Sequence, residues 1–185
     1  MDEEEEAVPN SSKDTDEDWS PDFHWLTPQV AVGACFPMER ALNVAQVHGV
    51  TAVIDLRKED RDDDEALRTA GIELLHLPTP DLEPASIDML DLGVEWTRAR
   101  IERGGKILIH CQHGIGRSTL LALCVLVDQG WQPLDALAHA KDQRGAMSPS
   151  RSQYDGWVAW LTAHGKAAPD YHTFGCIAYR HLAHG

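Results

Sequence analysis

The sequence predicts a single α/β domain: a central, mostly parallel, twisted sheet of about four to five strands, flanked by helices and followed by a helical bundle. A length of 185 residues fits one domain with tails. Up to residue 117, strand-like segments alternate with helical patterns, which is typical of a parallel sheet with helical crossovers. After residue 117 every pattern is helical, so this part is expected to form a bundle beside the sheet.

The strand-like segments are short, rich in β-branched residues and bounded by turn residues. We expect Pro78 and Pro80 to end the third strand, because proline cannot donate to a strand ladder. A Gly104-Gly105 turn precedes the fourth strand. The predicted strands span residues 29–33, 51–56, 72–77 and 106–110.

Helical periodicity fills the stretches between and after these strands. Ser86 is a plausible N-cap for one helix, and four acidic residues suit the start of another. The run from Leu120 to Val127 is apolar on every side, so its helix is expected at the centre of the core. The predicted helices span residues 39–48, 62–70, 86–103, 118–129, 133–141, 150–164 and 173–182.

Charge is concentrated at the N-terminus. The chain has 30 acidic and 16 basic residues, a net charge of −14, and residues 1–18 hold nine of the acids and one lysine. We predict an acidic disordered tail over residues 1–18 and a domain over residues 19–185. Because an acidic protein repels polyanions, we expect neither a nucleic-acid partner nor stable membrane association.

Cysteine usage and the first residues predict a cytoplasmic protein. The four cysteines show no CxxC spacing, which favours reduced thiols, and Cys124 is expected in the core. The acidic N-terminus differs from a cationic, apolar signal peptide, and the longest apolar run has eight residues, too few to span a bilayer. We expect a monomer.

The segment HCQHGIGRS, residues 110–118, joins the end of a predicted strand to the start of the apolar helix. Its two glycines allow the backbone N–H groups to turn inward and, with the helix N-terminus, to bind a tetrahedral dianion. The same field lowers the pKa of a thiol, so Cys111 is a candidate nucleophile. Arg117 can donate two parallel hydrogen bonds to a phosphate. The predicted phosphate-binding residues are Gln112, His113, Gly114, Ile115, Gly116 and Arg117.

This segment resembles the signature loop of the cysteine-based phosphatases of the protein tyrosine phosphatase superfamily: His-Cys, five residues, Arg and Ser or Thr. In size and layout the chain is similar to the compact, atypical dual-specificity phosphatases. The resemblance covers about residues 22–165, including residues 53–57, 76–81 and 147–150. It implies a protein phosphatase that needs no metal and no cofactor, acting on phosphotyrosine and also on phosphoserine or phosphothreonine in proteins.

The resemblance also implies a two-step mechanism. The thiolate of Cys111 attacks phosphorus while Asp81, thirty residues earlier, gives a proton to the leaving oxygen. Water then hydrolyses the cysteinyl-phosphate with Asp81 as base, and Ser118 stabilises the departing thiolate. His110 supports the loop and tunes the pKa of the cysteine.

Other residues have competing interpretations. Asp88 is a rival general acid, but its position within a helical pattern favours Asp81. Gln153 is interpreted as a helix-surface residue, with positioning of the hydrolytic water as the alternative. We interpret Asp55 and Arg57 as a structural pair that supports neighbouring loops.

Two further chemistries are weaker. Cys35 or Cys176 would trap an oxidised Cys111 as a disulfide only if one of them lies beside it, which the sequence cannot establish. The histidines are scattered, and only His181 and His184 have helical spacing, which does not indicate a metal site.

Three alternative functions stay open. One is a lipid phosphatase acting on phosphatidylglycerophosphate or a phosphoinositide, although the loop contains no Lys or Arg before Arg117. Another is an RNA 5′-triphosphatase, although those enzymes usually have asparagine at the position that Gly116 occupies in this chain. The third is a phosphate-binding pseudophosphatase, although such relatives typically lack the cysteine, the arginine or the acid.

Overall fold

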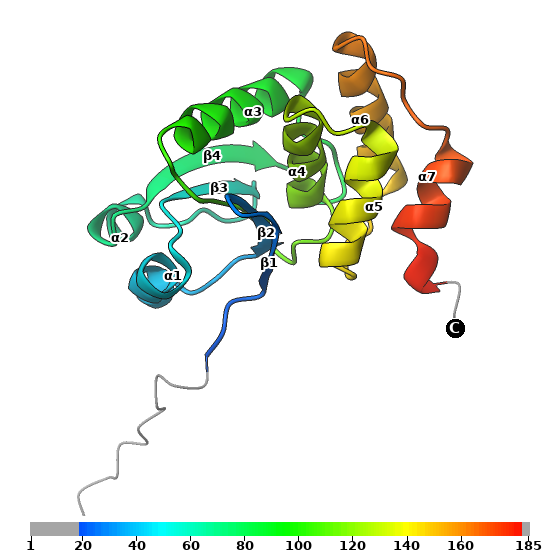
Figure 1. Cartoon of the computed structure of the whole chain (residues 1–185). Coiled ribbons are helices and arrows are strands. Elements are labelled where there is room, and N and C mark those ends of the chain that lie inside the picture. Colours follow the sequence, from blue (N-terminus) through cyan, green and yellow to red (C-terminus); the bar gives the residue numbers. More distant parts are fainter. Residues whose placement is uncertain (1–18, 183–185) are drawn as a thin grey trace, which may run out of the picture.

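A five-stranded sheet of order β1-β2-β5-β3-β4 forms the centre of the computed structural model, which describes residues 19–182 (Figure 1). All neighbouring strands are parallel except β1 and β2. The predicted acidic tail, residues 1–18, lies outside the described residues. The strands are β1 (Phe23–Thr27), β2 (Val30–Ala34), β3 (Ala52–Arg57), β4 (Glu73–Thr79) and β5 (Ile107–Cys111).

Helices cover both faces of the sheet (Figure 1). Two short helices, α1 (Ala41–His48) and α2 (Asp64–Thr69), lie on one face. The other face carries α3 (Ile87–Glu102) and α4 (Arg117–Asp128), and α5 (Pro133–Gln143) and α6 (Arg151–Ala163) pack beyond α4, followed by α7 (Tyr171–Ala178). Two short 3₁₀ helices are η1 (Met38–Arg40) and η2 (Arg180–Leu182). The predicted α/β class and the bundle after residue 117 are confirmed.

The strand residues alternate between two cores, as the period of two in a strand requires. Val32, Ile54 and Ile109 face α4, whereas Val53 and Leu108 face α1 and α2. Helix α4 is buried from its first residue to Val127, which confirms the prediction of a central apolar helix. Cys124 is fully buried within it, as expected.

One predicted strand boundary was wrong, and one strand was not predicted. Strand β4 continues through Pro78 to Thr79 rather than ending before it. It pairs only with β3 and is therefore an edge strand, where a proline with no N–H disrupts no second ladder. No strand was predicted for residues 23–27, which form β1 and extend the sheet by antiparallel pairing with β2.

The parallel strands place the sequence motifs at one edge of the sheet. Cys111 at the end of β5 is in register with Ala34 of β2, and His110 is in register with Asp55 of β3. The segments that follow the parallel strands therefore converge here, which is where sites of open α/β sheets lie. In the described part of the chain, no helix has the length and apolarity needed to cross a membrane.

Candidate active site

The loop between β5 and α4 carries the candidate nucleophile. Cys111 is the last residue of β5, and α4 starts at Arg117 after an N-cap at Gly116 that has no side-chain cap. The first-turn N–H groups of α4 are therefore not satisfied by a capping side chain and face the loop with the positive end of the helix dipole. An anion in this loop would therefore be stabilised by the first-turn N–H groups and by the positive end of the helix dipole.

The loop turns its carbonyl groups outward. The carbonyl oxygen of Gln112 accepts from the N–H of Cys35 (3.4 Å), and that of Ile115 accepts from the N–H of Ser148 (3.0 Å). Arg144 donates through Nη2 to the carbonyl of His113 (2.9 Å) and through Nε to that of Gly114 (2.7 Å). With four successive carbonyls bonded on the outside, the loop N–H groups are free to turn inward and form an anion nest.

Two glycines are required by close contacts. Gly114 has a φ of +66°, and a Cβ there would lie 2.3 Å from the carbonyl carbon of Gly33. A Cβ on Gly116 would lie 2.3 Å from Oε1 of Gln153. The loop can therefore approach β2 closely only with glycine at position 114, and it packs on α6 without displacing the Gln153 carboxamide only with glycine at position 116.

The surroundings of Cys111 favour its thiolate. Burial opposes ionisation, but a hydrogen bond with the Ser118 hydroxyl, the backbone N–H groups of Ser118 and Gly114 and the charge of Arg117 outweigh it and lower the pKa of Cys111. The sulfur lies 3.3 Å from Oγ of Ser118. The structure thus brings the predicted nucleophile and the predicted thiolate stabiliser into contact.

Arg117 is buried and held by a carboxylate that the sequence analysis did not identify. Its Nη1 and Nη2 donate to the two carboxylate oxygens of Glu59 at 2.7 and 2.6 Å, and Nη1 also donates to the carbonyl of Thr79. The ion pair lowers the pKa of Glu59 to about 2. No described residue accepts a hydrogen bond from Nε of Arg117, which leaves one donor of the buried guanidinium available to a ligand.

Asp81 lies at the mouth of a cavity of about 320 Å³ that Cys111 and Arg117 also line. Its carboxylate is exposed and lies 3.6 Å from Nη2 of Arg117. The rival acid Asp88 lies on the exposed side of the first turn of α3 and does not line this cavity. The geometry is therefore consistent with Asp81 as the general acid, and the predicted assignment stays a prediction.

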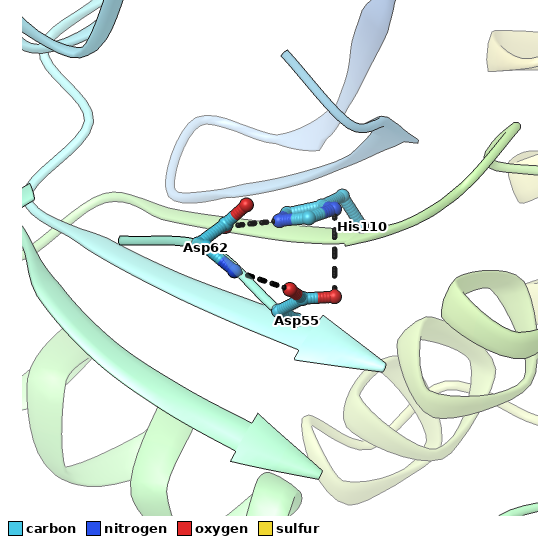
Figure 2. Close-up of side chains that lie close together, drawn as sticks. All are labelled: Asp55, Asp62 and His110. Carbon is cyan, nitrogen blue, oxygen red and sulfur yellow. Dashed lines mark hydrogen bonds and ion pairs between the residues drawn. The ribbon is translucent and has the colours of Figure 1, made fainter. Parts of the chain in front are cut away.

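The side chain of His110 belongs to a buried polar network behind the loop (Figure 2). Its Nε2 lies 2.5 Å from a carboxylate oxygen of Asp62, and its Nδ1 lies 3.1 Å from the carbonyl oxygen of Cys111. Burial favours the neutral ring, but the hydrogen bond and charge of Asp62 and the charge of Asp55 raise the pKa of His110. Both ring nitrogens face oxygen acceptors, an arrangement that favours the protonated ring.

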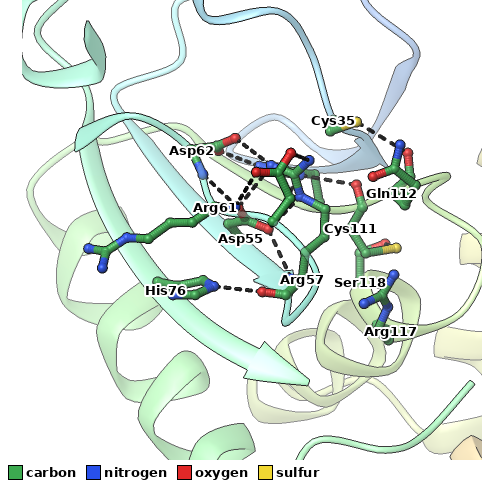
Figure 3. Close-up of polar contacts among 12 residues, drawn as sticks. Cys35, Asp55, Arg57, Arg61, Asp62, His76, Cys111, Gln112, Arg117 and Ser118 are labelled. Atoms are coloured by element: carbon green, nitrogen blue, oxygen red, sulfur yellow. Dashed lines mark hydrogen bonds and ion pairs between the residues drawn. The ribbon is translucent and has the colours of Figure 1, made fainter. Parts of the chain in front are cut away.

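Arg57 completes this network and balances its charge (Figure 3). It donates to Asp55 through Nε and Nη2, both at 3.0 Å, and to Asp62 through Nη2 at 2.9 Å. The expected ion pair of Asp55 and Arg57 is therefore present. The grouping of Asp55, Asp62 and His110 resembles a metal site in spacing, but these side chains already hydrogen-bond to one another or to Arg57.

Other predictions for single residues have mixed outcomes. The interpretation of Gln153 as a helix-surface residue was wrong: it is buried, lines the cavity, and its Oε1 accepts from the N–H of Ser150 in a capping box. Cys35 lies beside the loop, with its sulfur 3.5 Å from the carbonyl of Gln112. Cys176 is exposed on α7 and does not line the cavity, and His184 lies outside the described residues.

The loop side chains point toward the cavity rim. Gln112, His113 and Ile115 line the cavity, and His113 is exposed, as expected for its mouth. Binding of a phosphate by the backbone of residues 112–116 is supported by the outward carbonyls and stays a prediction.

The sequence analysis missed Glu59 and Arg144. Glu59 follows β3 by two residues, so the rule that carboxyl ends of parallel strands share one edge could have placed it near Cys111. Arg144 follows α5, and its contact with the loop depends on how the bundle packs. No local sequence signal reports that packing.

Comparison with known proteins gives a family for most of the chain. Residues 36–163 match the family described as dual specificity phosphatase, catalytic domain. Human dual specificity protein phosphatase 2 is 28% identical over 132 residues, which are 69% of this chain and 40% of that protein. Tyrosine-protein phosphatase yvh1 of Schizosaccharomyces pombe is 35% identical over 51 residues, 27% of this chain and 16% of that protein. The match thus covers well under half of either relative.

Solved structures share the architecture. Tk-PTP in the active form superposes with a TM-score of 0.71 and 25% identity, covering 77% of this chain and 97% of that one. PTPMT1 in complex with PI(5)P has a TM-score of 0.71 at 22% identity, over 77% of this chain and 98% of that one, and shows the same fold. Fold, signature loop and family match agree, and the chain belongs to the dual specificity phosphatase family.

Proposed function

We propose that this protein hydrolyses phosphate monoesters on proteins through a cysteinyl-phosphate intermediate. Its substrates are phosphotyrosine and also phosphoserine or phosphothreonine. One observation carries the proposal: a thiol with a lowered pKa lies in a loop whose carbonyls face outward, beside a buried arginine with an unpartnered Nε. A nucleophile, an anion nest and a positive charge within one loop fit phosphoryl transfer.

The proposed first step is attack of the Cys111 thiolate on phosphorus. The bond from phosphorus to the leaving oxygen breaks, and Asp81, protonated, gives that oxygen its proton. The loop N–H groups and Nε of Arg117 stabilise the charge that spreads over the other phosphate oxygens.

The proposed second step returns the enzyme to its starting state. Asp81, now a carboxylate, takes a proton from water as the water oxygen attacks phosphorus and the S–P bond breaks. Ser118 donates a hydrogen bond to the departing thiolate and keeps its proton, and inorganic phosphate leaves the site. In this proposal Gln153, which is buried beside Gly116 and lines the cavity, orients this water, the role that was the alternative interpretation from the sequence. No step requires a metal ion.

The cavity favours a substrate that carries one phosphate. Among the residues that line it, Arg117 is the single Lys or Arg. Lys58 lines a second hollow, which shares Asp81 with this cavity, together with two carboxylates, Glu59 and Asp81. A lipid phosphatase is the second candidate, because PTPMT1 was crystallised with PI(5)P. A headgroup with several phosphates would find one arginine for all of them, which favours the protein substrate.

Phosphate release by the full chain in a metal chelator tests this proposal. The substrates are a phosphotyrosine peptide, a phosphothreonine peptide, phosphatidylglycerophosphate, phosphoinositides and 5′-triphosphorylated RNA. We expect turnover of the peptides, abolished in Cys111→Ser and reduced about 100-fold or more in Asp81→Asn. Cys176→Ser is the matched control, because this exposed thiol lies outside the cavity.

Three outcomes would contradict parts of the proposal. Release from only the lipid or the RNA would leave the chemistry intact and overturn the substrate class. Activity that requires a divalent ion would overturn the metal-free mechanism. A wild-type protein that binds phosphopeptide but releases no phosphate would indicate a pseudophosphatase.

A further inference from the structure

The C-terminal segment formed by α7 and η2, residues 171–182, reaches the catalytic cavity from outside the matched domain. The family match ends at residue 163. Nevertheless Tyr179 and Leu182 line the same cavity as Cys111 and Arg117. Figure 1 shows α7 alongside α5 and α6. This segment is therefore part of the site without being part of the family domain.

Specific contacts hold the segment in place. Phe174 of α7 is fully buried, with its ring 4.9 Å from that of Tyr154 and 6.1 Å from that of Trp157 on α6. The hydroxyl of Tyr179 donates to the carbonyl of Pro149, in the loop that borders the cavity. The position of Tyr179 is thus fixed by its ring contact with Phe174, at 5.9 Å between centroids, and by its hydrogen bond to Pro149.

A buried lysine anchors η2. Nζ of Lys141 donates to the carbonyls of Gly145 and Met147 and to Nδ1 of His181, at 2.7, 2.6 and 2.8 Å. Three acceptors use all three donors of the ammonium group. Arg180 also donates to Asp142 at 2.5 Å. These contacts place Leu182, the next residue after His181, at the cavity rim.

The rim is apolar in a way that the catalytic chemistry does not require. Of the eight large apolar side chains that are exposed in the described residues, three line this cavity: Leu82, Ile115 and Leu182. Pro149 and Tyr179 extend the same surface. Exposed apolar residues that gather around a pocket, rather than lying singly, mark a binding surface.

We propose that Tyr179 and Leu182 form one wall of the cavity, which we call the specificity wall. This wall favours aryl phosphates that have further apolar, aromatic surface next to the ring that carries the ester oxygen. This inference rests on the proposed function. It adds that the C-terminal segment contacts the group esterified to the phosphate. When the phosphate is bound at Cys111, its ester group points out of the cavity. There it meets the exposed apolar side chains of Leu82, Ile115 and Leu182. Burying apolar surface there lowers KM.

The test compares two monoesters that differ by one fused ring, phenyl phosphate and 2-naphthyl phosphate, on the full chain. Leu182 is 67% exposed, so Leu182→Ser removes the apolar side chain of the wall at this position with little effect on the core. We expect the naphthyl-to-phenyl ratio of kcat/KM to fall about fourfold or more through KM, the size of losing one methylene contact or more. Leu182→Met restores apolar surface and is expected to keep the ratio.

Leu92→Ser is the matched control, since Leu92 is 47% exposed on α3 and does not line the cavity. An unchanged ratio in Leu182→Ser, or an equal fall in Leu92→Ser, would overturn the wall while leaving the proposed function intact. If wild type hydrolyses a phosphotyrosine peptide but neither aryl phosphate, the wall alone is overturned. If wild type releases phosphate from the peptide and the aryl phosphates no faster than Cys111→Ser, both proposals fail.

Discussion

Replacing Ser118 by alanine tests how the site generates its nucleophile. The hydroxyl lies 3.3 Å from the sulfur of Cys111, whose side chain is buried. A hydrogen bond to a charged group contributes about 1.5–3 kcal/mol, and 1.36 kcal/mol corresponds to one pKa unit. Losing this donor should therefore raise the pKa of Cys111 by about one to two units, while the N–H groups and Arg117 keep part of the original shift.

Alkylation by iodoacetamide across a pH series measures this pKa, because only the thiolate reacts. Mass spectrometry of the peptide that contains Cys111 separates it from the exposed Cys176, which serves as an internal reference. Thr119→Val is the matched control. It removes a hydroxyl one residue further along α4 that donates to the carbonyl of Ile115 at 3.1 Å and makes no bond to the sulfur.

The same hydrogen bond acts a second time if the cysteinyl-phosphate forms. In Ser118→Ala the departing thiolate loses its donor, so the second step should slow more than the first. Rapid mixing with an aryl phosphate would then show a burst of product followed by slow turnover. An unchanged alkylation pKa in Ser118→Ala, or an equal rise in Thr119→Val, would refute the assignment of the hydroxyl as thiolate stabiliser.

Three further substitutions probe the charges around the loop. Because the pKa of Glu59 is lowered from 4.5 to about 2, its contribution to stability is complete above pH 4.5 and is lost as the pH falls toward 2. Glu59→Gln should remove this part of the pH dependence of the urea unfolding midpoint. An unchanged pH dependence would argue against the ion pair with Arg117. Asp62→Asn leaves the His110 imidazolium without its carboxylate and should lower the free energy of unfolding by about 3–5 kcal/mol. Since the pKa of His110 is raised, the stability it contributes is fully present below pH 6.5 and is lost as the pH rises through the folded value, a dependence that urea titrations should find flattened in Asp62→Asn. Arg144→Lys keeps the charge but cannot hold two neighbouring carbonyls with one planar group, so kcat/KM should fall about 10- to 100-fold with the circular dichroism spectrum unchanged, and full activity would show that the loop holds its shape without Arg144.

The sheet and the signature loop could be predicted because their signals are local. The strands are separate apolar runs, and Cys111, the two glycines and Arg117 lie within seven consecutive residues between a strand and a helix. Strand β1 was not predicted because Phe23–Thr27 mixes polar and aromatic residues, and it forms a strand only through its pairing with β2. The boundary at Pro78 was misjudged because edge position, which makes proline tolerable, is a property of the sheet order.

The supporting residues of the site could not be predicted in the same way. Arg144 lies 30 residues after Gly114, to which it donates, and Glu59 lies 58 residues before Arg117. Gln153 was interpreted as a surface residue because helical spacing does not reveal which face packs over a loop. These contacts arise where three separate segments meet, so they depend on tertiary packing and not on any pattern in a single segment.

The distribution of the arginines explains how an acidic chain forms an anion site. Each of the three buried guanidinium groups is already paired with a carboxylate: Arg57 with Asp55, Arg144 with Asp22, and Arg117 with Glu59. Their charges are therefore largely compensated. The attraction for a phosphate then comes from oriented N–H groups of the loop, from the start of α4 and from the unpartnered Nε of Arg117. Net charge counts ionised side chains and not these dipoles. The value of −14 therefore argues against a polyanion spread over the surface, and it has no bearing on a single dianion held inside the loop.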